Sequence, residues 1–149
     1  MIRADAPAAE KNDDDRSPRA TALAFIDRIN AHDVDGIVGL LSDEYQFVNS
    51  SGDHFSGRQF MRETWLDQFG KHPDFRIRVE RVIADENGVA IFGFSEGTYA
   101  PDGELREENK WSVPAAHLLM AREGKITYYE TFSDASMVYD LMHARGGDQ

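Results

Sequence analysis

A histidine in the middle of a predicted strand is the first candidate for chemistry. His117 lies in the stretch AHLLMAREGKITYYETFSD, which reads as two strands joined by a tight turn. Because imidazole has an ordinary pKa of about 6.5, a neutral histidine can take a proton from the carbon next to a carbonyl group. These residue types favour His117 as a general base, with Asn49 and Tyr129 as catalytic partners that stabilise the oxyanion.

The turn predicts which residues lie beside His117. A type I turn followed by a left-handed glycine would pair Ala121 with Lys125. Counting from that pair, His117 lies opposite Tyr129 and diagonal to Thr131. One face of the hairpin then mixes small, hydroxyl and apolar side chains, namely Ala115, His117, Leu119, Thr127, Tyr129, Thr131 and Ser133. Such a face predicts the floor of a mainly apolar cavity with a few polar groups that orient a ligand.

Other residues are candidates for the walls of this cavity. Most are aromatic, and a phenol or an indole presents both an apolar ring and one hydrogen-bond donor. We expect the pocket to include Tyr45, Phe47, Trp65, Tyr99, Trp111, Leu119 and Thr131.

The leading candidates also have purely structural interpretations. His117 can be a buried neutral residue that is hydrogen-bonded to Tyr129 or Thr131. Trp65 belongs to an apolar stripe of the kind that packs into a core, and Asn49 can close a turn through the backbone. Both interpretations stay open at the level of the sequence.

The other face of the hairpin is more apolar than a solvated sheet face requires. It carries Met120, Ile126 and Phe132 together with Ala116, Leu118, Tyr128 and Glu130. Helices can cover only one face of the sheet, so this side predicts the interface of a homodimer.

Helices are predicted before and after the strands. Ser17-Pro18 begins the first helix, whose inward positions are Ala22, Phe25, Ile26 and Ile29. The second helix spans about 33–41, and the third spans about 56–70, with Gly70 as its left-handed terminator. A last helix is capped by Ser133 or Asp134 and turns Met137, Val138, Leu141 and Met142 inward.

Strands are predicted from Tyr45, from Phe75, after the turn at 86–88, over about 107–121, and over 126–133. In the strand from Phe75, period two places Ile77, Val79 and Ile83 on one side. Gly93 and Gly97 mark where the sheet can bend. We therefore predict an α+β fold, with helices packed on the concave face of a curved antiparallel sheet.

Composition limits the domain organisation and the partners. The chain has 149 residues, 41% of them hydrophobic, which is enough for one core. We expect a disordered acidic tail over 1–16, a single domain over 17–145 and a flexible end over 146–149. The net charge of −11 argues against nucleic acid and anionic membranes as partners.

Several other functional classes lack their sequence signals. The chain has no cysteine, which excludes thiol catalysis, disulfides and cysteine-based metal sites. Its histidines lack paired metal-ligand spacing, and no phosphate loop or dinucleotide motif occurs, so we expect neither a metal nor a cofactor. Without a signal peptide or a long apolar segment, a cytoplasmic protein is the simplest expectation.

Three fragments together resemble a known family. FIDRINAHDVDGIVGLLSDEYQFVNSSG, FSGRQFMRETW and WSVPAAHLLMAREGKITYYETFSD resemble the polyketide cyclase SnoaL-like branch of the nuclear transport factor 2-like superfamily, which also includes ketosteroid isomerase-like proteins. The resemblance covers about 19–142. It implies a cone-shaped, cystatin-like barrel around an apolar pocket, usually in a dimer.

The resemblance also implies roles for individual positions. His117 corresponds to the histidine on the penultimate strand of the cyclase-like members, and Thr131 stands where these members carry an aspartate on the last strand. Asn49 stands where isomerase-like members carry a carboxylate base.

These observations lead to a hypothesis about function. The protein would be a cyclase, isomerase or lyase that binds a small apolar carbonyl-containing molecule and moves a proton next to the carbonyl, with His117 as base. The alternatives on the same scaffold are a non-catalytic small-molecule-binding protein and a dimeric interaction module. A cavity with an unpaired His117 at its wall favours the enzyme, whereas a filled cavity with a fully hydrogen-bonded His117 favours the interaction module.

Overall fold

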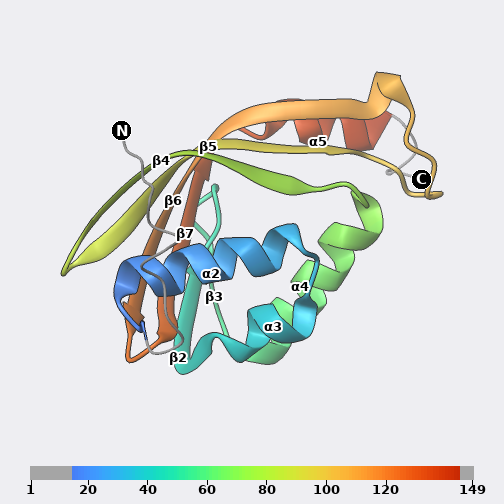
Figure 1. The fold of residues 1–149 in the computed structure, drawn as a ribbon. Helices are drawn as coiled ribbons and strands as arrows, with labels where there is room; N and C mark the ends of the chain where they lie inside the picture. Colours follow the sequence, from blue (N-terminus) through green and yellow to red (C-terminus); the bar gives the residue numbers. More distant parts are fainter. Residues whose placement is uncertain (1–14, 145–149) are drawn as a thin grey trace.

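The structure, a computed structural model, describes residues 15–144 (Figure 1). The predicted domain over 17–145 falls within this range except for its last residue. Of the two predicted tails, residues 1–14 and 146–149 lie outside the described residues. None of the described helices is long and apolar enough to cross a membrane.

The described strands form one curved sheet in the order β3-β2-β7-β6-β5-β4. Their bounds are β2 Leu41–Val48, β3 His54–Ser56, β4 Arg76–Asp85, β5 Gly88–Thr98, β6 Lys110–Arg122 and β7 Lys125–Ser133. Neighbouring strands are antiparallel except β2 and β7, which run parallel. The prediction of a wholly antiparallel sheet is therefore wrong at this pair. β2 and β7 are far apart in the sequence, so no tight turn fixes their relative direction.

The helices are α2 Pro18–Asn30, α3 Val34–Gly39, α4 Arg58–Lys71 and α5 Ser136–Met142. The predicted start of α2 is confirmed, because the Ser17 hydroxyl accepts a hydrogen bond from the Ala20 amide at 3.1 Å. The role predicted for Gly70 is wrong, since α4 continues through it with an ordinary helical backbone. A short 3-10 turn, Glu107–Asn109, precedes β6 where the sequence predicted strand.

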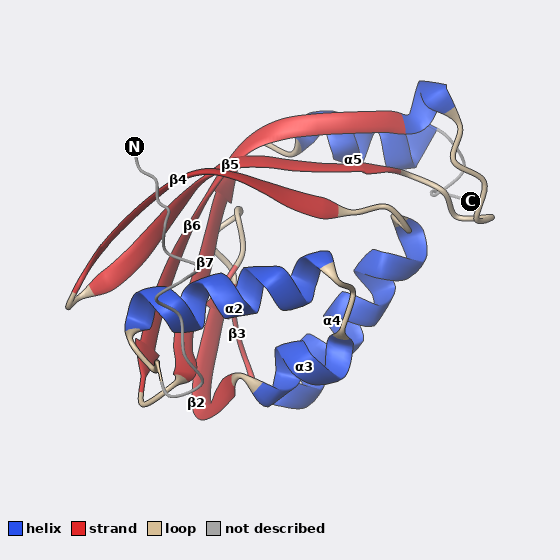
Figure 2. Ribbon diagram, viewed as in Figure 1, coloured by secondary structure: helices blue, strands red, loops and turns tan. Residues whose placement is uncertain are grey.

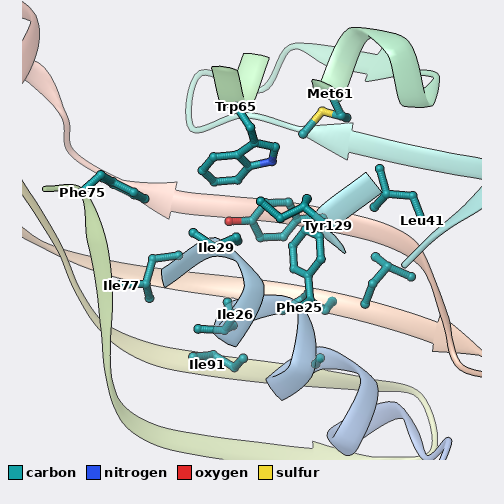
Figure 3. Close-up of a cluster of buried hydrophobic side chains, with 14 of the residues drawn as sticks. Phe25, Ile26, Ile29, Leu41, Met61, Trp65, Phe75, Ile77, Ile91 and Tyr129 are labelled. Atoms are coloured by element: carbon teal, nitrogen blue, oxygen red, sulfur yellow. The ribbon is translucent and has the colours of Figure 1, made fainter. Parts of the chain in front are cut away.

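Helices α2, α3 and α4 cover one side of the sheet, as Figure 2 shows. Figure 3 shows where the layers meet: Phe25 and Ile29 of α2 lie beside Tyr129 of β7, and Ile26 lies toward Ile91 of β5. The predicted α+β architecture, with helices on the concave face of a curved sheet, is confirmed. The sheet does not close into a full barrel, because β3 and β4 each have one neighbour only among the described strands.

The sheet bends where β4 and β5 pair. Val79 pairs with Gly93 and Arg81 with Phe92, so Glu80 is an extra residue in a bulge. A Cβ atom on Gly93 would overlap the Arg78 carbonyl oxygen, so only glycine fits this close approach. Beyond the bulge the faces of β4 are inverted: Ile83 is exposed, although period two placed it on the same side as Ile77, and Val82 packs against the core instead.

The β6–β7 hairpin differs from the predicted register. Its turn has two residues, Glu123 and Gly124, both with positive φ (54° and 78°), and a second irregularity follows between Met120 and Ala121. Ile126 is consequently buried in the core rather than exposed on the outer face.

Beyond this irregularity, His117 pairs with Thr131, and Tyr129 pairs with Leu119. The predicted pairing of His117 with Tyr129 is therefore wrong by two positions. His117, Tyr129 and Thr131 nevertheless share one face, because a shift of two residues restores the direction of every side chain.

Candidate functional site

A cavity of about 240 Å³ lies between α4, the end of β2 and the inner face of β6 and β7. His117, Tyr129 and Thr131 line it from the hairpin, and Trp65 lines it from α4. We call it the His117 cavity. The sequence places these groups together because alternate residues of paired strands face the same side.

His117 is the most unusual group of this cavity. Its side chain is buried, and its Nδ1 lies 3.1 Å from the Tyr129 hydroxyl. Its Nε2 is also buried and has no hydrogen-bond partner among residues 15–144. Burial lowers the pKa of His117 to about 4, so the imidazole is neutral at neutral pH.

Tyr129 supports His117 from deep within the core. Burial raises the pKa of its phenol well above the ordinary value, so the hydroxyl keeps its proton. Its ring packs edge-on against Phe25, with ring centroids 5.1 Å apart, and lies 5.5 Å from the ring of Phe47. The phenol therefore holds a fixed position beside the imidazole.

Three hydroxyl groups form a polar edge of the cavity. The Ser50 Oγ lies 3.1 Å from Thr131 Oγ1 and 3.2 Å from Ser133 Oγ. Ser50 is exposed and the other two are half-buried, so this cluster connects the cavity with solvent. Thr131 and Ser133 were predicted on this face, but Ser50 was not. Its only sequence signal is its place in the turn after β2.

The predicted pocket residues fall into three groups. Phe47, Trp65 and Thr131 line the His117 cavity together with Asn49. Tyr45 and Leu119 are fully buried in the core and are not part of the cavity wall. Tyr99 and Trp111 lie elsewhere, around His72.

Asn49 is occupied by its own turn. Its Oδ1 accepts hydrogen bonds from the amides of Ser51 (3.0 Å) and Asp53 (2.9 Å). Its Nδ2 is 3.4 Å from the Asp53 carboxylate. The structure thus places Asn49 at the cavity wall with its side chain closing the loop between β2 and β3, which is the turn interpretation raised by the sequence.

A second chamber of about 360 Å³ adjoins the first. The two share Gln68 of α4 and Tyr139 of α5, among other residues. His72 lines this chamber, is buried, and accepts a hydrogen bond at Nδ1 from Trp111 Nε1 at 3.1 Å. His72 was not predicted as a site residue, because its place directly after a helix gives no sign of burial and histidine is intermediate between buried and exposed residue types.

The His117 cavity is lined by uncharged groups only, among the residues that the structure describes. Glu96 pairs with Arg78 at 3.0 Å outside this cavity. Partial burial raises the pKa of Glu96, but hydrogen bonds from Arg78 and Ser112 outweigh this effect and hold it below its ordinary value. Within residues 15–144, no three acidic or histidine side chains gather in a way that could hold a metal ion.

These features suit a neutral, mainly apolar molecule. The apolar rings supply the burial of such a ligand, and the free nitrogen of His117 supplies one directional contact. The described wall of this cavity has no charged side chain and no cluster of side chains that could hold a metal ion.

Comparison with known proteins agrees with this architecture. The family model described as a SnoaL-like domain matches residues 22–129. A Jannaschia protein proposed to be a SnoaL-like polyketide cyclase is 16% identical, with a TM-score of 0.73 over 90% of this chain and 96% of that chain. A nuclear transport factor 2-like protein from Burkholderia thailandensis is also 16% identical, with a TM-score of 0.72 over 86% and 98%.

A more similar sequence among the solved structures has a different description. An uncharacterised cystatin-fold protein from Novosphingobium aromaticivorans is 24% identical, with a TM-score of 0.62 over 78% of this chain and 97% of that chain. At these levels of identity the structures establish the fold alone. No curated protein matches the chain.

Proposed function

Because the matching family model spans well over half of the chain, the protein belongs to the SnoaL-like domain family, and from this premise we propose that it acts on a small carbonyl-containing molecule. The molecule binds in the His117 cavity, where a proton moves next to its carbonyl group. Cyclases, isomerases and lyases of carbonyl compounds all depend on such a step.

One observation carries this proposal: the buried Nε2 of His117 has no hydrogen-bond partner among the described residues, and His117 lines a cavity. A buried polar atom without a partner costs about 1–3 kcal/mol, so a purely structural histidine would be expected to use both nitrogens. His72 illustrates the structural case, since its nitrogens contact Trp111 and the backbone of Thr98. The free nitrogen of His117 supports a ligand contact.

A neutral imidazole can assist enolisation in two ways. It can take the proton from the carbon, which is the base role derived from the sequence, or it can donate a hydrogen bond to the carbonyl oxygen. Both roles need the same residue at the same wall. Replacement of His117 by an apolar residue therefore tests the function without assuming either role.

We expect the protein to accelerate exchange of the α hydrogens of 2-tetralone, a bicyclic ketone, in deuterium oxide. His117→Leu should lower the protein-dependent rate by roughly 100-fold, the low end of what a positioned acid or base contributes. Exchange is followed by proton NMR. The matched control is His54→Leu, because His54 is exposed on β3 and does not line the cavity; equal exchange by the wild type and His117→Leu would exclude this role.

A non-catalytic binding protein is the second candidate. It is favoured by the uncharged wall, since Asn49 and Thr131 stand where related enzymes carry carboxylates. It predicts that 2-tetralone binds, as measured by calorimetry, without any acceleration of exchange. The interaction module predicts no binding in this cavity.

We also propose that a second copy of the chain covers the outer face of the sheet. A groove of about 750 Å³ lies there, lined by Ile83, Phe92 and Phe132 with Glu80 and Arg81 beside them. The three apolar side chains are each at least 40% exposed. Glu80 is already paired with Arg78 of its own chain at 2.7 Å, so the proposed dimer rests on the three exposed apolar side chains.

Phe132→Asp is expected to convert this dimer into a monomer, because it places a charge at the centre of the apolar surface. Sedimentation equilibrium would measure the change in mass. Leu66→Asp is the control, since Leu66 is equally apolar and exposed but lies on α4. A wild-type monomer, or a dimer that survives Phe132→Asp, would contradict the assignment.

A further inference from the structure

The Tyr129 hydroxyl has a single hydrogen-bond partner among residues 15–144, and that partner is His117 Nδ1 at 3.1 Å. The ring of Tyr129 is buried, and its aromatic neighbours Phe25 and Phe47 offer no acceptor. A phenol carries one proton to donate, and a buried donor without an acceptor is costly. The Tyr129 hydroxyl therefore donates its proton to Nδ1.

This direction fixes the tautomer of His117. A neutral imidazole has one nitrogen that accepts and one that donates. If Nδ1 accepts from Tyr129, the ring proton is on Nε2, which is the nitrogen without a protein partner. The His117 cavity is then faced by an N–H donor.

The opposite tautomer leaves an unpaired proton in the core. To act as a base, Nε2 must carry a lone pair, so Nδ1 must carry the proton and donate it to the Tyr129 oxygen. The Tyr129 hydroxyl proton would then have no acceptor. The geometry thus disfavours the state that a base requires.

Trp65 independently indicates that the wall of this cavity presents hydrogen-bond donors. Its indole Nε1 is buried and has no partner within the described chain, and the residue lines the same cavity. Indole can only donate. Two buried donors at one wall favour a ligand that brings acceptor oxygens.

We propose that Tyr129 is a positioning residue that holds His117 as the Nε2–H tautomer, and that the cavity consequently selects neutral ligands with a carbonyl oxygen as acceptor. This inference rests on the proposed function for the identity of the ligand, but not for the tautomer. In the proton shift, the α proton goes to a water molecule and the C–H electron pair forms the enolate double bond. The charge that develops on oxygen is stabilised by the Nε2–H group.

The tautomer is tested by nitrogen-15 NMR of the free protein. His72 is an internal reference, because Trp111 can only donate to its Nδ1 and so fixes its proton on Nε2. We expect His117 to show the same pattern as His72, with the signals assigned by their loss in His117→Gln. A protonated Nδ1 in His117 would overturn the inference. In Tyr129→Phe the preference for the ring proton on Nε2 should disappear. An unchanged His117 pattern would mean that Tyr129 does not set the tautomer.

Ligand preference is tested with three bicyclic probes in calorimetry. 2-Tetralone offers an acceptor, indole only a donor, and tetralin neither. We expect 2-tetralone to bind about tenfold more tightly than tetralin, as one net hydrogen bond provides. Indole binding more tightly than 2-tetralone would refute the predicted selection.

The variant His117→Gln should keep the preference for 2-tetralone, because its amide can accept from Tyr129 and donate into the cavity. His117→Leu should lose it, and equal loss in both variants would contradict the donor role. If no probe binds while the wild-type NMR pattern is as expected, the proposed ligand fails and the tautomer stands. If 2-tetralone binds and Nδ1 is protonated, the tautomer fails and the ligand stands.

Discussion

Replacing Gly93 by alanine is expected to lower the free energy of unfolding by about 3 kcal/mol, the upper end of what overpacking usually costs. The added Cβ would overlap the Arg78 carbonyl oxygen at the bulge between β4 and β5. Gly93 and Arg78 lie on paired strands, so neither backbone can move away from the clash without breaking the ladder. In a domain of this size the change corresponds to a fall in melting temperature of about 10 °C.

Gly70→Ala is the matched control for this substitution. Gly70 lies inside α4, and a Cβ there would meet no atom within 4 Å. Alanine should therefore stabilise the protein by roughly 0.5–1 kcal/mol, the difference in helix propensity. Urea unfolding measures both variants. A Gly93→Ala protein within 1 kcal/mol of the wild type would show that the strands can separate at the bulge without cost.

The same bulge connects the bend of the sheet to the candidate site. Gly93 pairs with Ala115 on its other side, and Ile91 pairs with His117. A widened bulge would shift β5, and with it the strand that carries the histidine. We expect loss of stability and loss of ligand binding to go together in Gly93→Ala.

The helices could be predicted because their signals are local. Ser17 and Pro18 mark the start of α2 within the helix itself, and Phe25, Ile26 and Ile29 repeat at helical spacing toward the core. No distant contact is needed to read either signal. The overall α+β class follows from the same local patterns.

The faces of the strands were harder to predict, because one extra residue inverts a face. Glu80 is such a residue in β4, and it turns Ile83 outward. In the β6–β7 hairpin, the shorter turn and the later irregularity each displace the register by one residue. Between the two, Ile126 turns inward; beyond both, Tyr129 and Thr131 recover the predicted face.

Part of the candidate site could be predicted, because the two register shifts in the hairpin cancel at Tyr129 and Thr131. His117, Tyr129, Thr131, Phe47 and Trp65 do meet at one cavity. Tyr99 and Trp111 were assigned to the same cavity, but they gather at His72, beside the second chamber. Periodicity shows which side of a strand a residue faces, but it does not show which part of a bent sheet that side covers.

Acid is expected to destabilise the wild-type protein more than the variant His117→Gln. Burial lowers the pKa of His117 to about 4 in the folded protein, whereas an unfolded chain has a histidine pKa of about 6.5. Below pH 6.5 the unfolded chain therefore binds a proton that the folded protein excludes. By linkage, the stability associated with His117 is complete above pH 6.5 and declines as the pH falls toward 4.

The size of this effect follows from the difference between the two pKa values. Each unit is worth about 1.4 kcal/mol, so the wild type should lose about 3 kcal/mol between pH 6.5 and 4 through this residue. The pKa of His72 is also lowered, chiefly by burial, but His72 and the carboxylates are common to both proteins. Subtracting the two curves of unfolding free energy against pH therefore isolates His117.

Urea titrations at half-unit pH intervals would provide these curves. Two parallel curves would mean that His117 takes up its proton in the folded state at an ordinary pH, as a solvent-accessible imidazole does. A steeper decline in the wild type would instead mean that folding keeps this ring neutral. Neutrality is what both candidate roles require, because a protonated ring can neither accept a proton from carbon nor keep the acceptor that Tyr129 needs.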